Sequence, residues 1–208
     1  MLGAFSTMSD PFSNSSTTSD LVRLKQFLNE SLYKAGVDVP DQSRLLNLAC
    51  GRADESAVLA DVFGKNGIQL TGLDIRTREI YEAQERWKKY LPENAEAEFL
   101  VQDCSKLGDL QTLPDDFNIA FMRHQNFWNG DNTWNKIYDE ALHRLDENGY
   151  LVITSYFDRE HQLALDAIQN LGAELVLTEQ NSQSRSIHDV PPGVEKSIDR
   201  HLAIFKKP

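Results

Sequence analysis

A chain of 208 residues with 40% hydrophobic and 25% charged residues is long enough to bury a core and has the composition of a globular protein. Its formal net charge of −11 argues against a protein that grips nucleic acid by its phosphates, because such proteins normally carry a basic face. No stretch approaches the roughly 20 apolar residues of a membrane span, and two cysteines are too few for a disulfide framework. We therefore expect a cytoplasmic protein whose partner is a small molecule, with no nucleic acid and no membrane; the oligomeric state stays open.

The first residues of the chain are typical of a tail rather than of a targeting segment. Residues 1–19 are rich in Ser and Thr, contain no Lys or Arg and have no apolar core, which argues against a secretory signal peptide. Ser19 and Asp20 then have the character of a helix cap, and Gly36 closes the helix that follows. We divide the chain into a flexible tail, residues 1–19, and a single domain, residues 20–208, with the N-terminal helix and link in 20–43 and the α/β core in 44–208.

Beyond residue 44, short apolar runs alternate with amphipathic segments, which is typical of α/β proteins. Strands are predicted at residues 45–49, 69–73, 98–101, 117–122, 150–156, 174–180 and 201–206, and helices begin near residues 54, 80, 132 and 158. The alternation predicts a mostly parallel, seven-stranded sheet with helices on both faces, a Rossmann-like three-layer sandwich. The last two strands have no helix between them, so we expect them to pair antiparallel at one edge.

Three segments of this alternation carry a common signal. The run from Arg44 to Glu55 is an apolar strand that leads through a turn of small residues into a helix. A second apolar run ends at Asp74, and a third ends at Asp103. In nucleotide-binding α/β units the turn lets the backbone approach the ligand, and the acid after the next strand holds ribose hydroxyls. The three segments together predict a nucleotide-binding unit.

The order of elements resembles the class I S-adenosylmethionine-dependent methyltransferase family over about residues 45–207. The family's first turn usually consists of an acid, an apolar residue and then Gly-x-Gly-x-Gly. The matching positions here are Asn47, Leu48, Ala49, Cys50, Gly51, Arg52 and Ala53, so one of the three glycines is kept. The resemblance implies a sheet that closes with an antiparallel strand, S-adenosylmethionine as cofactor, and methyl transfer to an acceptor that we expect to be a small molecule.

The resemblance also implies roles for single residues. Asp74 would hold both ribose hydroxyls, and Asp103 would lie near the adenine amino group, with the backbone amide of Cys104 facing the ring. Asn47 stands in place of an acid, which we expect to weaken the hold on the methionine ammonium group, whereas alanine is the mildest replacement for the missing glycines. We therefore expect cofactor binding to survive. The candidate cofactor-binding residues are Asn47, Ala49, Cys50, Gly51, Asp74, Ile75, Asp103, Cys104 and Arg123.

The loop at residues 123–131 is the candidate acceptor site, because it follows the fourth strand next to the point where the strand order of such a sheet reverses. We expect His124 to act as a base on an acceptor hydroxyl or amine, since the ordinary pKa of histidine is near neutrality; a structural histidine is the alternative. Tyr156, after the fifth strand, is the second catalytic candidate. Phe127 and Trp128 either line a pocket or pack under the loop.

Two segments outside these motifs are expected to cover the acceptor site rather than to take part in the chemistry. The N-terminal helix, residues 21–35, and the long polar connection, residues 181–199, are expected to act as lids over the acceptor. The other histidines show no ligand spacing such as HExxH, so we expect no metal site. These histidines are His143, His161, His188 and His201.

Two other functions stay open at this point. A catalytically silent, cofactor- or partner-binding module with this fold is favoured by the missing acid and the two missing glycines. A nicotinamide-dependent oxidoreductase would need Ala49, Gly51 and Asp54 as its glycine turn. Asp54 would then place a carboxylate at the pyrophosphate, which disfavours this function.

Overall fold

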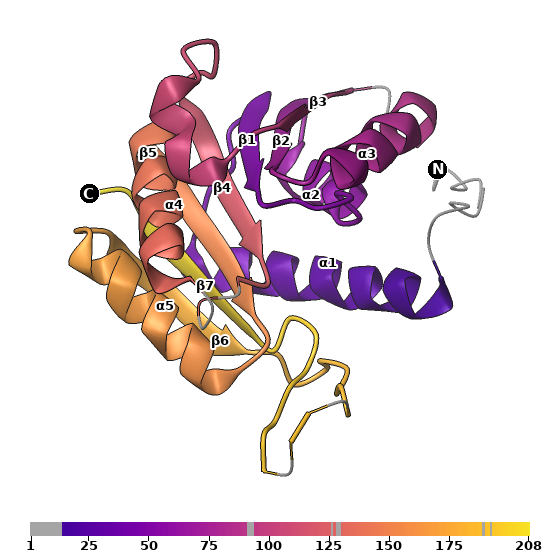
Figure 1. Ribbon diagram of the computed structural model, residues 1–208, viewed down its shortest axis with the longest axis vertical. Helices are drawn as coiled ribbons and strands as arrows, with labels where there is room; N and C mark the ends of the chain where they lie inside the picture. The colour runs from indigo at the N-terminus through magenta and orange to yellow at the C-terminus, as the bar shows by residue number, and fades with distance from the viewer. Residues whose placement is uncertain (1–13, 91–93, 126, 128–129, 189, 192) are drawn as a thin grey trace.

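The computed structural model describes residues 14–90, 94–125, 127, 130–188, 190–191 and 193–208. They form a seven-stranded sheet between two layers of helices (Figure 1). The helices are α1 (Ser15–Ala35), α2 (Ser56–Phe63), α3 (Thr77–Tyr90), the 3-10 helix η1 (Cys104–Asp109), α4 (Asp131–Arg144) and α5 (Asp158–Asn170). The strands are β1 (Ser43–Leu48), β2 (Ile68–Asp74), β3 (Ala95–Val101), β4 (Phe117–Arg123), β5 (Leu145–Ser155), β6 (Glu174–Gln180) and β7 (His201–Lys206).

The strand order is β3-β2-β1-β4-β5-β7-β6. Strands β1 to β5 pair in parallel, and β7 pairs antiparallel with both β5 and β6. This confirms the predicted Rossmann-like fold with its antiparallel final strand. Because β1 is flanked by β2 on one side and β4 on the other, the strand order reverses between β1 and β4, and α/β proteins collect their ligands at the carboxyl end of such a point.

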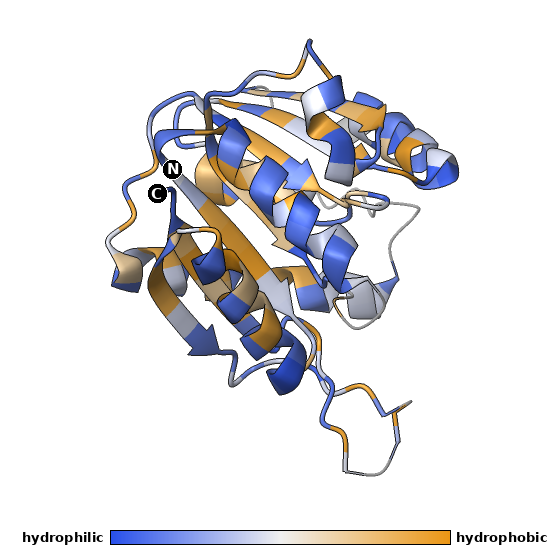
Figure 2. Cartoon of the chain, turned by 60° about the vertical axis from the view of Figure 1, so that its left-hand side comes forward, coloured by the Kyte–Doolittle hydropathy of each residue, from blue (hydrophilic) through white to orange (hydrophobic). Residues whose placement is uncertain are grey.

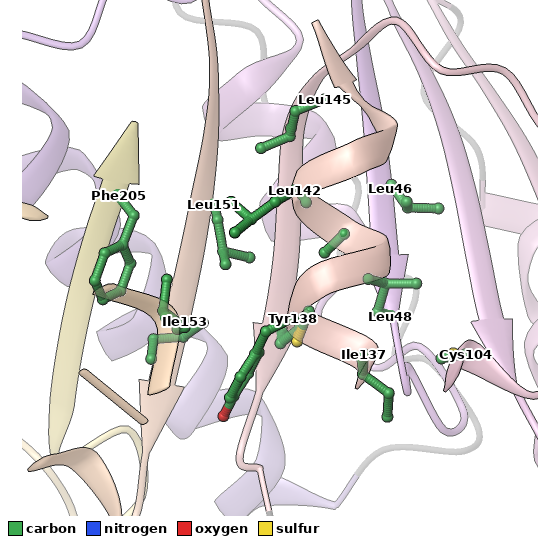
Figure 3. Close-up of a cluster of buried hydrophobic side chains, with 14 of the residues drawn as sticks. Leu46, Leu48, Cys104, Ile137, Tyr138, Leu142, Leu145, Leu151, Ile153 and Phe205 are labelled. Carbon is green, nitrogen blue, oxygen red and sulfur yellow. The ribbon is translucent and has the colours of Figure 1, made fainter. Parts of the chain in front are cut away.

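Alternate side chains of each strand enter two separate hydrophobic cores. Leu46 and Met122 point into the core that η1, α4 and α5 cover, while Leu45 and Phe121 point into the core under α1, α2 and α3. Figure 3 shows the first core, where α4 places Tyr138 and Leu142 over the central strands. In Figure 2 the strands are largely hydrophobic, whereas the helices that cover them carry hydrophilic residues. Burial of this alternating pattern on both faces is what orders the sheet.

Three predicted boundaries are wrong near the N-terminus. Helix α1 begins at Ser15, not after Ser19, because Asn14 is its cap and accepts a hydrogen bond from the Thr17 N–H at 2.9 Å. Residues 15–19 of the predicted tail are therefore helical, and residues 1–13 lie outside the described part of the chain. Strand β1 ends at Leu48, so that position 49 belongs to the turn.

Two further boundaries, the starts of α2 and β5, differ from the prediction. Helix α2 begins at Ser56 with Glu55 as its N-terminal flanking residue, so the predicted start at Asp54 is wrong. Strand β5 begins at Leu145 rather than at Tyr150, and the register with β4 shifts there in place of the expected turn. None of the described helices is long and apolar enough to cross a membrane.

Candidate functional site

The turn after β1 holds three residues in the left-handed region. The φ angles of Ala49, Gly51 and Ala53 are 53°, 55° and 54°. These are the positions at which the glycines were expected, and alanine is strained there because its Cβ approaches the carbonyl oxygen, at a cost of roughly 1 kcal/mol each. The chain thus keeps the backbone path of a glycine-rich turn without two of the glycines.

Asp74, the last residue of β2, faces this turn from the neighbouring strand. Its Oδ2 accepts a hydrogen bond from the Gly51 N–H at 2.8 Å, and its Oδ1 accepts bonds from the Arg76 N–H at 2.9 Å and Nε–H at 3.0 Å. Burial alone would raise the pKa of Asp74, but the bonds from Arg76 and Gly51 outweigh it and lower the pKa. The carboxylate is buried, whereas the Arg76 side chain is 58% exposed.

The other predicted residues of this half lie around the ends of β1 to β3. Ile75 is an exposed apolar side chain, 66% accessible, directly after Asp74. Asp103 caps η1 by accepting bonds from the N–H and Oγ–H of Ser105 at 3.0 and 2.7 Å. Cys50 and Cys104 are both buried free cysteines, and burial raises the pKa of both thiols, that of Cys104 to about 12. They are packing residues at neutral pH rather than nucleophiles.

Asn47 is fully buried near the end of β1 and contacts a residue that the sequence did not indicate. Its Nδ2–H donates to Oε1 of Glu55 at 2.6 Å, and Oε2 of Glu55 lies 3.9 Å from a guanidinium nitrogen of Arg123. The Asn47 Oδ1 has no hydrogen-bond partner among the described residues. Burial raises the pKa of Glu55, against the opposing effects of Arg123 and Asn47.

Arg123 ends β4 and is fixed by a carboxylate from far along the chain. Asp199, two residues before β7, accepts bonds from Nε–H and Nη2–H of Arg123 at 3.0 and 2.6 Å. The Thr154 hydroxyl donates to the same carboxylate at 2.8 Å. Burial would raise the pKa of Asp199, but Arg123 and His124 hold it far below its ordinary value. Such a bidentate, buried pair is among the stronger charged contacts in proteins.

His124 contacts the same carboxylate and stacks on the second catalytic candidate. Its Nε2 lies 2.8 Å from Oδ1 of Asp199 and 3.2 Å from the backbone nitrogen of the same residue, whose N–H points to it, and its ring stacks on Tyr156 with centroids 3.8 Å apart. One nitrogen cannot donate to the carboxylate and accept from the N–H, and we assign the proton to Nε2 because its contact with the carboxylate is the shorter; the lone pair is then on Nδ1. Burial lowers the pKa of His124, with Asp199 opposing, so the ring is neutral at pH 7. His124 and Asp199 both have positive φ angles, 60° and 48°.

The predicted aromatic pair of this loop is only half described. Phe127 is buried and stacks on Tyr138 of α4 with centroids 6.2 Å apart, so it packs under the loop, while Trp128 lies outside the described residues. A carboxylate of α5 ties the loop to that helix, since Glu160 accepts the Phe127 N–H at 3.1 Å. Burial raises the pKa of Glu160 to about 7.

The two expected covers are joined by an ion pair between a buried carboxylate and a guanidinium that is 43% exposed. Asp20 of α1 accepts bonds from Nε–H and Nη2–H of Arg185 at 3.0 and 2.6 Å, and it also pairs with Arg23. Arg185 belongs to the connection between β6 and β7, the segment that also delivers Asp199. Helix α1 packs against α2 and β6 at the same time, so helix and connection meet beside the carboxyl ends of the central strands (Figure 1).

Comparison with known proteins identifies the family. A family model described as a methyltransferase domain matches residues 40–199, more than half of the chain. No sequence match is found among curated proteins.

Three solved structures illustrate the shared fold. A protein from Pyrococcus horikoshii is 16% identical with a TM-score of 0.65, covering 94% of this chain and 93% of that one. A magnesium protoporphyrin IX methyltransferase from Synechocystis, solved with bound S-adenosylmethionine, is 13% identical with a TM-score of 0.61, covering 94% and 86%. An S-adenosylmethionine-dependent methyltransferase from Methanosarcina mazei is 15% identical with a TM-score of 0.61, covering 81% and 93%. The chain belongs to the methyltransferase domain family, and S-adenosylmethionine is the cofactor that this membership implies.

Proposed function

We propose that the protein transfers a methyl group from S-adenosylmethionine to a small-molecule acceptor at the carboxyl edge of the sheet. The observation that carries the proposal is the turn after β1, in which Ala49, Gly51 and Ala53 share a left-handed backbone and Gly51 donates to Asp74. Strained backbone at such a place is typical of a ligand site. The match to a methyltransferase domain supports methyl transfer as the class of reaction.

The residues around this turn suit the nucleoside part of the cofactor. A Cβ at Gly51 would meet only the ends of two side chains, Nη2 of Arg76 at 3.0 Å and Oε2 of Glu79 at 3.9 Å, so the backbone is open to a ligand once Arg76 swings away. Asp74 then offers two carboxylate oxygens to the cis-diol of a ribose. The exposed side chain of Ile75 suits the face of an adenine ring. These residues would hold the nucleoside.

The residues at the ends of β4 and β5 suit an acceptor that must lose a proton. When bound, S-adenosylmethionine supplies a methyl group already activated by its sulfonium charge, so alignment and exclusion of water are the protein's main tasks. His124 takes the acceptor's proton at Nδ1, because Asp199 holds Nε2–H at 2.8 Å and stabilises the imidazolium that forms. Tyr156, stacked on the imidazole, keeps its plane fixed.

Two features support a small acceptor rather than a macromolecule. Helix α1 and the β6–β7 connection are tied together by Asp20 and Arg185, which supports the expected role of these two segments as covers of the acceptor site. The net charge of −11 disfavours a nucleic-acid acceptor.

The proposal is tested by calorimetric titration of the purified protein with S-adenosylmethionine and, separately, with NADH. Micromolar binding of the first alone is expected. The protein is then incubated with S-adenosylmethionine and pools of small hydroxyl and amine compounds, and S-adenosylhomocysteine is quantified by mass spectrometry. We expect release above the no-acceptor rate with at least one pool, lost in His124→Gln. Binding of neither ligand, or of NADH alone, would contradict the proposal.

A further inference from the structure

Glu55 occupies the position before helix α2 without acting as its cap. The side chain makes no capping hydrogen bond to the helix, and the first turn contains no other acid. Instead the carboxylate turns back into the sheet edge and accepts the Nδ2–H of Asn47 at 2.6 Å. Glu55 is only 4% exposed, so its burial without a helix-capping role requires another explanation.

The charges around Glu55 do not cancel. Glu55, Arg123 and Asp199 form one buried cluster in which two carboxylates face a single guanidinium. Asp199 takes the two short bonds from Arg123, at 3.0 and 2.6 Å, whereas Glu55 stays 3.9 Å from the nearest guanidinium nitrogen. His124, which also touches Asp199, is neutral at pH 7 because burial lowers its pKa. With both carboxylates ionised, the cluster carries one negative charge that no second cation among the described residues balances, in keeping with the raised pKa of Glu55, and an arriving cation would favour the ionised form.

A second polar atom in the same place lacks a partner. The Asn47 Oδ1 is buried and accepts no hydrogen bond among the described residues, although the other end of the carboxamide is bound to Glu55. A buried acceptor without a donor costs about as much as a lost hydrogen bond and is rare in native proteins. The carboxamide oxygen and the carboxylate together form an acceptor pair at the point between β1 and β4 where the strand order reverses.

We propose that Glu55 and the Asn47 carboxamide form the subsite for the primary ammonium group at the amino-acid end of the cofactor. The inference rests on the proposed function for the identity of the ligand. An ammonium group brings both things that the cluster lacks, a positive charge for Glu55 and N–H donors for Asn47 Oδ1. The acid that was expected at position 47 is thus supplied from position 55, and the turn from Ala49 to Asp54 brings it there.

The test compares two ligands that differ at the amino-acid end. S-Adenosylhomocysteine carries the ammonium group, and 5′-methylthioadenosine keeps the nucleoside and thioether without it. In Glu55→Gln we expect the affinity for S-adenosylhomocysteine, measured by calorimetry, to fall about 10- to 100-fold, as for a lost charged hydrogen bond. The affinity for 5′-methylthioadenosine should change less than about twofold. Equal losses for both ligands would show a merely structural residue, and no loss for either would also overturn the inference.

A charge swap and a neighbouring acid serve as controls. The double variant Asn47→Asp with Glu55→Gln keeps the hydrogen bond between the two side chains and returns the negative charge to position 47. It should recover S-adenosylhomocysteine binding to within about threefold, and a failure to recover while 5′-methylthioadenosine binds normally would contradict the role of the charge. Asp61→Asn removes a carboxylate of α2 that pairs with Lys25 at an exposed position outside the cluster and outside the turn after β1, so both affinities should stay unchanged. Wild-type protein that binds neither ligand would refute the proposed function instead.

Discussion

Two buried carboxylates at the same edge of the sheet, Asp74 and Asp199, are held in opposite ways. Asp74 is bound by backbone N–H groups and by the guanidinium of Arg76, a side chain that is 58% exposed and adjacent in sequence. Asp199 is bound by Arg123, which is 13% exposed, and by Thr154, both far away in sequence. The first carboxylate can exchange its side-chain partner for a ligand, and the second cannot without unfolding its surroundings.

This difference separates a binding group from a positioning group. Separating an exposed guanidinium from its carboxylate costs little free energy, because water replaces the lost hydrogen bonds. Such pairs contribute roughly 0–1 kcal/mol to stability. A buried pair is different, since removing one partner leaves the other charged and without solvent. We therefore infer that Asp74 acts mainly on ligand affinity and Asp199 mainly on the stability and geometry of the site.

The largest expected effect is that of Asp199→Ala on folding. The change leaves the Arg123 guanidinium buried without its carboxylate, and we expect the free energy of unfolding to fall by about 3–5 kcal/mol. Urea denaturation followed by circular dichroism measures the loss. Asp158→Ala is the matched control, because that carboxylate is itself 66% exposed and its partner Arg200 keeps a second carboxylate, Glu195, so the loss should be about 1 kcal/mol or less. Equal losses of unfolding free energy in the two variants would contradict the distinction between a buried and an exposed carboxylate.

A third buried carboxylate, that of Glu160, differs from Asp74 and Asp199 because it has no guanidinium partner among the described residues. Burial raises its pKa to about 7 from an ordinary 4.5, although the backbone N–H groups of Phe127 and Tyr156 oppose the shift. The folded state therefore keeps a proton that the unfolded state releases between about pH 4.5 and 7, so Glu160 makes the protein less stable as the pH rises through this range. At pH 8 its full destabilising effect is present.

Glu160→Gln removes this titration. The free energy of unfolding of the variant minus that of the wild type should rise by up to about 3 kcal/mol between pH 4.5 and 7.5. The difference is the quantity to measure, because His161, whose pKa burial lowers to about 4, changes stability in the opposite direction over much of the same range. Urea titrations of both proteins at four pH values provide it. A difference that stays flat would mean that burial does not raise the pKa of Glu160 in the folded protein.

The sequence predicted one half of the edge far better than the other. Gly51 and Asp74 were found because a turn and the end of the next strand are linked by one helix, so their spacing follows from the repeating unit. Asp199 lies 75 residues from His124, in a polar stretch that resembles any solvated loop, and only the insertion of β7 beside β5 brings it to the site. Glu55 did give a signal, but an acid beside a helix start is usually a favourable charge for the helix.

The fold was predictable for a related reason. Alternating apolar residues such as Leu45 and Leu46 specify which face of a strand is buried, and this pattern survives any shift of a boundary. The ends of the elements depend on single contacts that the pattern does not contain. The cap at Asn14 and the shifted register at Leu145 are both of this kind, and both were missed.

Asp74→Ala is expected to act on the ligand more than on the fold. Loss of the charged acceptor should weaken S-adenosylmethionine binding by about 1.5–3 kcal/mol, since both ribose hydroxyls lose their partner. The free energy of unfolding should fall by only about 1 kcal/mol, because the Arg76 side chain is exposed to solvent. Calorimetry and urea denaturation on one preparation measure the two quantities. Unchanged affinity would contradict the ribose-binding role of Asp74. A loss of stability as large as that of Asp199→Ala would show that Asp74, like Asp199, acts mainly on the stability of the fold.

The smallest expected effect has the opposite sign and tests the exchange directly. Arg76 occupies both oxygens of Asp74, with Nε at 3.0 Å from Oδ1 and Nη2 at 3.2 Å from Oδ2, so under the proposed function a ribose would displace it. In Arg76→Ala the ligand no longer breaks this pair, and S-adenosylmethionine should bind more tightly by up to about 1 kcal/mol, or roughly fivefold. Arg78→Ala is the control, because Arg78 is also an exposed cation near the start of α3 but pairs with Glu82. Weaker binding in Arg76→Ala alone would mean that the guanidinium remains in the loaded site as a ligand-binding group, and Asp74 would then share the fixed character of Asp199.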